Sequence, residues 1–517
     1  MLKLHHFHGG LRLDGHKAES LQRGLLQATL PERLFLPLRQ HIGDHNKPRV
    51  EIGDRVLKGQ VIASDSALIC AAVHAPTSGT ISAIENYPVA HPSGKTDTCI
   101  VIDGDGDDKA VEPILADLEN LAPGEMIELI CRAGIVGLGG AVFPTSPKLS
   151  RGKVQGIGTL IINGVECEPY ITCDDTLMRF NAAEVIRGTG YLQRILAPRT
   201  TYIAIEDNKP EAIAAMAQAL TQHPLQNTEI TPIPTIYPSG GEKQLVQILT
   251  GKEVPHGQLA FDIGIFCQNV GTCAAITRAL EKDESLISRV VTISGDNIAQ
   301  PGNWEARLGT PISHLIELAG GYRHGATGHL VMGGSMMGFA LSGSEVPIVK
   351  ASNCIMVMRE ETIPKSPGYH DECIRCSKCT EVCPAQLLPQ QLYWHARAKA
   401  YQRTQEFHLF DCIECGCCST VCPSRIPLVQ YYRAAKSEIR AAQKAHFKSD
   451  RARIRFEFRE KRLLLKKQQD EERRRLKREA LQKKNARPGN GKPIADPVQA
   501  ALDRVKARKK ETQEDSQ

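Results

Sequence analysis

The chain has 517 residues, more than the roughly 250 to 300 that one hydrophobic core supports, so we expect at least three domains. Hydrophobic residues make up 41% of it, but no run approaches the roughly 18 apolar residues that cross a bilayer, which argues against an integral membrane protein. The first ten residues lack the apolar stretch and the cleavage site of a secretory signal, so a cytoplasmic location is expected.

Cysteines and charges are unevenly distributed. Nine of the 17 cysteines lie between residues 373 and 422, and in a long chain without an export signal such a cluster indicates metal ligands rather than disulfides. Residues 441–517 hold 24 Lys and Arg against 12 Asp and Glu, which leaves 40 and 46 for residues 1–440. A mildly acidic body therefore carries a basic tail.

Residues 1–115 predict a small β-barrel or sandwich, with short strands at 50–56, 59–63 and 74–81. The runs GDRVLKGQ (53–60) and APTSG (75–79) resemble the barrel-sandwich hybrid fold of biotinyl and lipoyl carrier domains. No lysine stands in the context that a carrier would present at its hairpin tip. We therefore expect a scaffold rather than a swinging arm.

Residues 120–285 predict an α/β domain, the candidate for catalysis. Apolar runs at 159–162 and 201–205 alternate with helical stretches such as 210–220, which favours an open mixed sheet. Residues 286–345 return to short strands among many glycines and predict a small α+β module.

A glycine-rich loop opens the α/β domain. Residues 134–148 read GIVGLGGAVFPTSPK. Closely spaced glycines let backbone N–H groups approach a phosphate or a flavin ring, and Lys148 adds a positive charge. Taken alone, the loop fits a structural turn equally well.

Three further runs accompany this loop. NGVECEPY (163–170) follows a predicted strand, at the carboxyl end where open α/β sheets bind ligands. YPSGGEKQ (237–244) and QNVGT (268–272) each enter a predicted helix, whose N-terminus is suited to anions. Cys167 and Cys173, near these runs, are interpreted as packing residues.

Residues 355–438 hold two cysteine boxes of identical spacing among short helices. Each reads C-x2-C-x2-C-x3-C-P, the run of two-cluster bacterial ferredoxins, in which the fourth cysteine of a box ligates the other [4Fe–4S] cluster. The first predicted cluster takes Cys373, Cys376, Cys379 and Cys422, and the second takes Cys412, Cys415, Cys418 and Cys383. Paired zinc knuckles are the alternative, but they rarely carry a third cysteine at a further x2 step. Cys417 does not fit as a ligand and is expected to pack.

The tail, residues 440–517, has almost no core-forming periodicity beyond Leu465. We expect a solvated helix that frays into disorder at 487–490. Contact with anionic lipid is the alternative to a merely solvated helix, since each Lys or Arg near such a surface contributes about 1 kcal/mol. No nucleic-acid partner is expected.

The four runs, in this order before the cysteine boxes, resemble the flavin- and NADH-binding subunit of respiratory complex I. The likeness to the C-type subunit of the Rnf/Rsx ion-translocating electron transport complex is greater. The opening FHGG (7–10) with His16, Lys17 and Ser20, the barrel runs and NGVECEPY all match that pattern. It covers about residues 5–435, and residues 286–345 resemble the β-grasp (SLBB) module of complex I.

The resemblance implies noncovalent FMN and NAD(H). Flavin contacts are implied for Gly137, Gly139, Lys148, Asn163, Glu166, Asn269 and Thr272, and dinucleotide contacts for Phe143, Lys148, Glu168 and Glu242. Leu138, Val165 and Lys243 depart from the complex I pattern, where an arginine, an aspartate and a glutamate stand.

The resemblance implies a multidomain α+β peripheral subunit on the cytoplasmic side of the inner membrane. Hydride exchange between NAD(H) and FMN would be followed by one-electron transfer through two [4Fe–4S] clusters. The complex would couple this electron transfer between NAD(H) and ferredoxin to ion translocation. Its partners would be the other Rnf/Rsx subunits and a ferredoxin-type carrier, and in Rsx systems the complex keeps a redox-sensing transcription regulator reduced. A diaphorase subunit of a soluble hydrogenase or formate dehydrogenase, and a non-enzymatic ferredoxin adaptor with a vestigial flavin domain, are the alternatives. The cluster of His5, His6, His8 and His16 is assigned no function.

Overall fold

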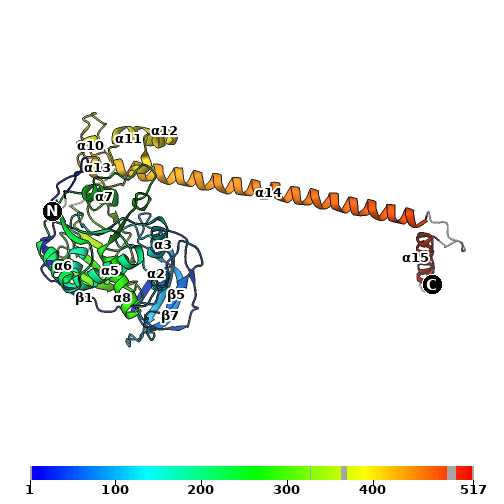
Figure 1. Cartoon of the computed structure of the whole chain (residues 1–517), viewed down its shortest axis with the longest axis horizontal. Helices are drawn as coiled ribbons and strands as arrows, with labels where there is room; N and C mark the ends of the chain where they lie inside the picture. The colour runs from blue at the N-terminus through cyan, green and yellow to red at the C-terminus, as the bar shows by residue number, and fades with distance from the viewer. Residues whose placement is uncertain (1–2, 326–327, 362–369, 486–495, 515–517) are drawn as a thin grey trace. The chain divides into compact units, whose positions relative to one another are not determined.

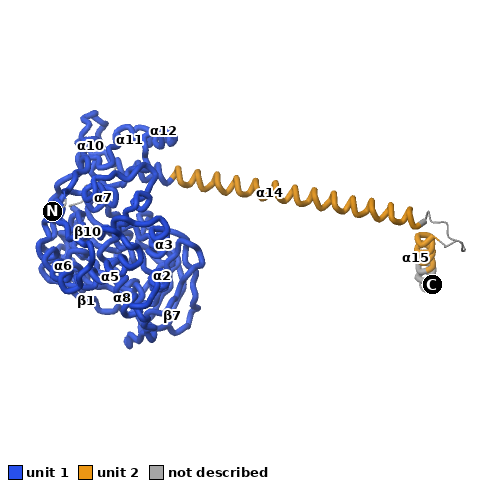
Figure 2. The backbone as a smooth tube through the Cα atoms, in the orientation of Figure 1, with its two compact units in different colours: residues 1–437 blue, residues 438–517 orange. Residues whose placement is uncertain are grey.

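The computed structural model describes residues 3–325, 328–361, 370–485 and 496–514 (Figure 1). The chain divides into two compact units, residues 1–437 and 438–517 (Figure 2). Every element that carries a predicted cofactor residue belongs to the first unit.

Two antiparallel sheets form the N-terminal barrel, in the orders β2-β8-β7-β4 and β3-β5-β6. The strands are β2 (Arg33–Pro37), β3 (Lys47–Pro48), β4 (Arg55–Val56), β5 (Val61–Ser64), β6 (Val73–His74), β7 (Gly79–Pro88) and β8 (Thr96–Gly104). Alternate side chains such as Leu34 and Leu36 are fully buried, because successive residues of a strand point to opposite faces.

A six-stranded sheet has the order β1-β14-β13-β17-β15-β16. Its elements are β1 (Leu25–Gln27), β13 (Ser288–Ser294), β14 (Gly302–Arg307), β15 (His329–Met332), β16 (Phe339–Ala340) and β17 (Cys354–Met358), with α1 (Ala18–Leu21) and α9 (Ile312–Leu318) beside them. Besides the expected segment 286–345, this sheet takes β1 and β17 from outside it. Leu34 and Ile62 of the barrel share one hydrophobic core with Ile293 and Trp304 of this sheet, so the barrel is anchored, as a scaffold would be.

The α/β domain has a four-stranded sheet in the order β11-β10-β9-β12. Its strands are β9 (Thr159–Gly164), β10 (Thr200–Glu206), β11 (Thr228–Ile233) and β12 (Ile265–Asn269). The expectation of a mixed sheet is wrong, because all three pairings are parallel. Helical crossovers return each strand in the same direction. Leu160 and Ile162 enter one core and Ile161 the other, so both faces of the sheet are buried.

Helices surround this sheet. They are α2 (Pro123–Arg132), α3 (Thr145–Gln155), α4 (Cys173–Phe180), α5 (Ala182–Leu196), α6 (Pro210–Gln222), α7 (Glu242–Thr250), η1 (Ala260–Ile263) and α8 (Val270–Lys282). Three of them, α3, α7 and α8, begin within predicted cofactor runs.

Short helices carry the cysteine boxes: α10 (Lys378–Glu381), α11 (Pro389–Arg397), α12 (Tyr401–Glu406), η2 (Leu409–Asp411) and α13 (Cys417–Thr420). The N-terminal strap, residues 7–11, ties them to the α/β domain. Gly10 N donates to Val382 O (3.1 Å), and Leu11 exchanges two backbone hydrogen bonds with Tyr237 (2.7 and 2.8 Å). The FHGG run is therefore a docking element.

The tail continues as α14 (Leu428–Asn485) and α15 (Pro497–Glu514). From 440 to 484 every side chain except Asp450 is exposed, as expected for a solvated helix. The predicted break at 487–490 lies outside the described residues. Within the described ranges, no helix combines the length and the apolar character needed to cross a membrane.

Candidate functional site

The eight cysteines of the two boxes gather into two sets of four. Each set lines a separate cavity: Cys383, Cys412, Cys415 and Cys418 the first, and Cys373, Cys376, Cys379 and Cys422 the second. These are the two sets expected from the exchange of the fourth ligand. Each cavity thus has four thiols, the number that a [4Fe–4S] cluster takes.

The two boxes also share their backbone conformation. The residues on either side of the second cysteine are left-handed in both, Arg375 and Ser377 (φ 58° and 64°) and Glu414 and Gly416 (φ 59° and 83°). Non-glycine residues rarely adopt a positive φ, and such turns point consecutive backbone groups and thiols inward. Burial raises the pKa of Cys412 to about 11, so binding as a thiolate would require the positive charge of iron.

The glycine loop packs directly on the start of α8. Gly137 N donates to Phe143 O (2.9 Å), and Leu138 N donates to Thr272 Oγ1 (2.9 Å). A Cβ on Gly139 would lie 3.2 Å from Asn269 Cβ, closer than most side chains tolerate. The sequence needs glycine here because the loop and the helix approach so closely.

Two asparagines join the ends of β9 and β12. Asn163 donates to Gly240 O (3.0 Å) and accepts from Val165 N (3.0 Å). Asn269 caps α8 by accepting from Gly271 N (2.8 Å), and its Nδ2 donates to Asp174 Oδ2 (2.6 Å). Both amides therefore order the carboxyl edge of the sheet, where doubly wound folds bind ligands.

Glu166 is buried behind this edge. Its carboxylate accepts from Asp174 N (2.8 Å) and Cys173 Sγ (3.4 Å), at the first turn of α4. Burial raises the pKa of Glu166 to about 7, against the opposing attraction of Lys17. Glu166 is thus a group that can hold a proton near neutral pH.

Lys148 lies beneath the glycine loop, on α3. Its ammonium donates to Cys267 O (2.6 Å) and to Glu242 Oε2 (3.3 Å), and it stands 4.9 Å from the centre of the Phe266 ring. Two residues predicted for the dinucleotide, Lys148 and Glu242, are therefore paired at the start of α7.

Glu168 faces the neighbouring sheet. Its Oε1 accepts from Met336 N (2.7 Å) and Met337 N (2.9 Å), and burial raises its pKa. Phe143, the fourth predicted dinucleotide contact, is half-buried in the glycine loop. The structure therefore brings Lys148 and Glu242 together, while Glu168 lies toward the loop that carries Met336.

A polar cofactor fits these runs. Among the described residues, two buried hydroxyls beside them, Thr145 Oγ1 and Ser239 Oγ, have no hydrogen-bond partner. Thr145 is the first residue of α3, and Ser239 shortly precedes α7. Since buried polar groups are normally hydrogen-bonded, a phosphate or ribityl group at this edge would satisfy donors that are otherwise unpaired.

Sequence reasoning missed the residues that hold the site from a distance. Lys17 donates to three backbone oxygens, Glu166 O (2.7 Å), Glu168 O (3.0 Å) and Ile171 O (2.6 Å). Lys209 is buried beside Glu206, with which it forms an ion pair. Lys17 stands in the matched N-terminal pattern, but no spacing indicated that its target lies about 150 residues further along the chain.

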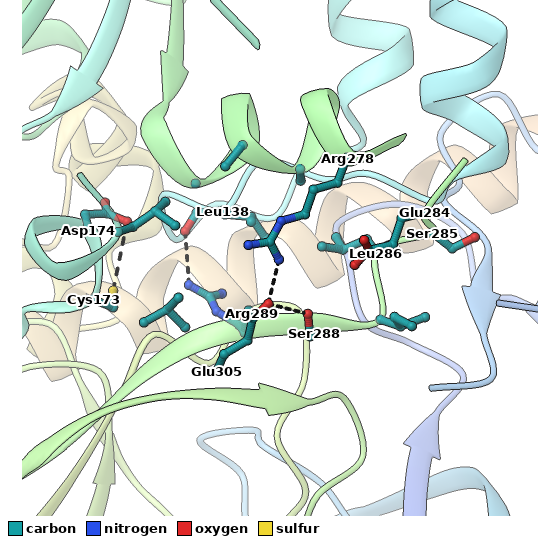
Figure 3. A pocket seen from close by; sticks show the side chains of 16 residues that line it. Leu138, Cys173, Asp174, Arg278, Glu284, Ser285, Leu286, Ser288, Arg289 and Glu305 are labelled. Carbon is teal, nitrogen blue, oxygen red and sulfur yellow. Dashed lines mark hydrogen bonds and ion pairs between the residues drawn. The ribbon is translucent and has the colours of Figure 1, made fainter. Parts of the chain in front are cut away.

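A cavity adjoins the site between α8 and β13 (Figure 3). The glycine loop contributes Leu138 to its lining, and Asp174 and Gly271 line it as well. From β13 the buried Arg289 donates to Leu138 O (3.5 Å). The six-stranded sheet thereby supports the glycine loop.

Four family models match the chain in order. They are the RnfC barrel sandwich hybrid domain over residues 5–107, the Nuo51 FMN-binding domain over 130–278, the SLBB domain over 290–340 and the 4Fe-4S dicluster domain over 372–426. These matches confirm the expected fold class and its order, and they confirm FMN and two [4Fe–4S] clusters as the cofactors.

Among solved structures, the chain is similar to a chain of the NAD+-reducing [NiFe]-hydrogenase in the H2-reduced state, with a TM-score of 0.43 and 17% identity over 66% of this chain and 72% of that one. The similarity is too low to support an argument.

Relatives match almost the whole chain. The C-type subunit of the ion-translocating oxidoreductase complex of Serratia proteamaculans is 48% identical over 97% of this chain and 69% of the relative. That of Pectobacterium atrosepticum is 46% identical over 98% and 71%, and that of Yersinia enterocolitica 49% over 88% and 65%. The chain therefore spans about two thirds of the length of these relatives. At this identity and coverage, the chain belongs to the family of C-type subunits of ion-translocating oxidoreductase complexes, electron-transport proteins that hold FMN and [4Fe–4S] clusters.

Proposed function

We propose that this chain transfers electrons between NAD(H) and a ferredoxin-type carrier, as a peripheral subunit of a complex that moves ions across the inner membrane. Membership of the C-type family supports the complex and its other subunits as partners. The observation that carries the electron path is one contact: Tyr237 of the α/β domain donates its hydroxyl to Cys415 O (2.7 Å). The flavin domain thereby touches a cysteine box directly.

The carboxyl edge of the parallel sheet would hold the flavin. Three kinds of group there are suited to a phosphate. The backbone approaches closely at Gly137 and Gly139, amide groups come from Asn163 and Asn269, and the N-terminus of α8 carries Thr272. FMN, when bound, supplies the conversion between hydride transfer and one-electron steps. Of the chain's own groups, Glu166 is placed to hold a proton near that edge.

The start of α7 would hold the dinucleotide. Lys148 and Glu242 are paired there, so a phosphate or a ribose hydroxyl could exchange for one partner of that pair. Phe143 offers a half-buried ring from the glycine loop. Glu168 would contribute indirectly, because its carboxylate binds the backbone of the loop that carries Met336.

Burial suggests the order of the two clusters. Cys415 and Cys417 are buried with Tyr237 in one apolar group, so the cavity lined by Cys383, Cys412, Cys415 and Cys418 adjoins the flavin domain. In the other cavity Cys376 is exposed, and the neighbouring Ile374 side chain is 67% exposed. We therefore assign electron entry from flavin to the buried cluster and exchange with the outside carrier to the exposed one.

The order is tested with one variant for each cluster, under anaerobic conditions. Cys376→Ser damages the exposed cluster, so NADH should still bleach the buried one. Cys383→Ser damages the buried cluster, so the exposed one should respond to dithionite but not to NADH. NADH bleaching of the remaining cluster in both variants would contradict the order. In every case flavin content should equal that of the unaltered chain, which excludes general misfolding.

The alternative of a non-enzymatic adaptor with a vestigial flavin domain is not retained, because the Nuo51 FMN-binding domain matches residues 130–278. The link to a redox-sensing transcription regulator belongs to the same proposal and has a test of its own. The regulator link predicts slower re-reduction of that regulator in cells that carry Cys383→Ser.

A further inference from the structure

Three side chains with metal-binding atoms meet next to the second cysteine box, and none of the three lines either cysteine cavity. His256, His408 and Asp411 offer one ligand atom each, and these atoms all lie within 4.8 Å of one another. We propose that His256, His408 and Asp411 bind a divalent transition metal ion, of which Zn2+ is the best match.

The three residues are held at fixed backbone positions. His256 stands on the turn closed by Gln258 N donating to Pro255 O (3.1 Å). His408 has a left-handed backbone (φ 57°) before η2, and Asp411 N donates to His408 O (2.9 Å), so these two residues share one turn. Local turns thus set the backbone position of each ligand residue.

The side chains already face one another. His256 Nδ1 contacts Asp411 Oδ2, and the rings of His256 and His408 lie edge to face with centroids 4.9 Å apart. An ion between them would replace the contact of His256 with Asp411 and would add a ring nitrogen of His408.

The donor set selects the chemical class of the ion. Imidazole nitrogen suits Zn2+, Ni2+ and Cu2+, whereas Ca2+ and Mg2+ prefer oxygen ligands throughout. Two histidines and one carboxylate leave the fourth position of a tetrahedral zinc site for water. Water has access, because the His256 side chain is 60% exposed.

The site would join two parts of the chain that carry the proposed electron path. His256 lies between α7 and η1 of the α/β domain, whereas Asp411 directly precedes Cys412, a proposed cluster ligand. A bound ion would fix the cysteine boxes against the flavin domain, in addition to the N-terminal strap. The proposed role of the ion is structural, and it does not depend on the direction of electron flow.

The test is equilibrium dialysis of the full-length, iron-loaded chain against Zn2+, with iron and zinc counted per chain. We expect one bound zinc with no loss of iron. His256→Gln and His408→Asn should each lose that zinc, and asparagine is chosen because it tolerates the left-handed backbone at residue 408.

His446→Gln is the matched control. His446 pairs with Asp450 (2.9 Å) on α14, and among the described residues this pair has no third ligand within the same reach. This variant should keep the zinc. Equal zinc in the unaltered chain and in both site variants would overturn the proposal, as would zinc uptake matched by loss of iron, which would place zinc among the cysteines.

Discussion

Lys17 gives the sharpest prediction for the flavin edge. Its ammonium holds three backbone oxygens of the segment that follows β9, at 2.6 to 3.0 Å. Lys17→Met keeps most of the side-chain volume but removes every one of these donors. The segment carrying Glu166 should then open more often, and FMN should bind less tightly.

The magnitude follows from the partial burial of Lys17. Hydrogen bonds to charged groups contribute about 1.5–3 kcal/mol each. Water can reach a half-buried site and can replace some of the hydrogen bonds lost in Lys17→Met. We therefore take the free energy of one such bond rather than three. That range corresponds to a roughly 10- to 150-fold rise in the dissociation constant of FMN, at about 1.4 kcal/mol per factor of ten.

The assay is rebinding of FMN to flavin-depleted protein, followed by quenching of flavin fluorescence. Lys153→Met is the control, since Lys153 is exposed on α3 of the same domain. The control variant should bind FMN as the unaltered chain does. Unchanged FMN affinity in Lys17→Met would show that these three hydrogen bonds do not hold the flavin edge, and equal loss of iron and flavin would indicate misfolding instead.

Three further variants probe docking, coupling and pH dependence. In Gly9→Ala the new Cβ would lie 2.5 Å from the carbonyl carbon of Val382, on a backbone with φ +71°. Thermal unfolding should therefore show a loss of about 1–3 kcal/mol in the free energy of unfolding. The control is Gly53→Ala, which also has a positive φ (+97°) but meets open space among the described residues, so it should lose less. Tyr237→Phe removes the hydroxyl donated across 2.7 Å to the buried cysteine box, so stopped-flow absorbance should show slower cluster reduction with flavin reduction unchanged. The pKa of Glu166 rises on folding from 4.5 to about 7, so its contribution to stability is complete below pH 4.5 and is lost as pH rises through about 7. Glu166→Gln should therefore show a smaller fall in melting temperature than the unaltered chain between roughly pH 5.5 and pH 8.

The cysteine sets could be predicted because their spacing is local and repeated. Each box places three thiols on one turn, and the proline after the fourth cysteine directs that thiol away from its own box. The left-handed residues Arg375 and Ser377 could not be foreseen, since neither is glycine. There the packing of the box sets the backbone, against local preference.

Long-range pairing was the part that local patterns did not contain. The three residues of β1 pair with β14, nearly 280 residues later, and no periodicity in so short a strand indicates a partner. Likewise, the target of Lys17 is a set of backbone oxygens, which carry no residue-specific signal. The site proposed at His256 and Asp411 joins residues 155 positions apart.

We propose that one chain contains the path from NADH through flavin to both clusters. The direct test is anaerobic titration of cluster-reconstituted protein with NADH, with flavin and iron–sulfur absorbance followed together. If the path is complete, flavin reduction should be followed by bleaching of the clusters. Clusters that respond to dithionite alone, with the flavin unreduced by NADH, would contradict it.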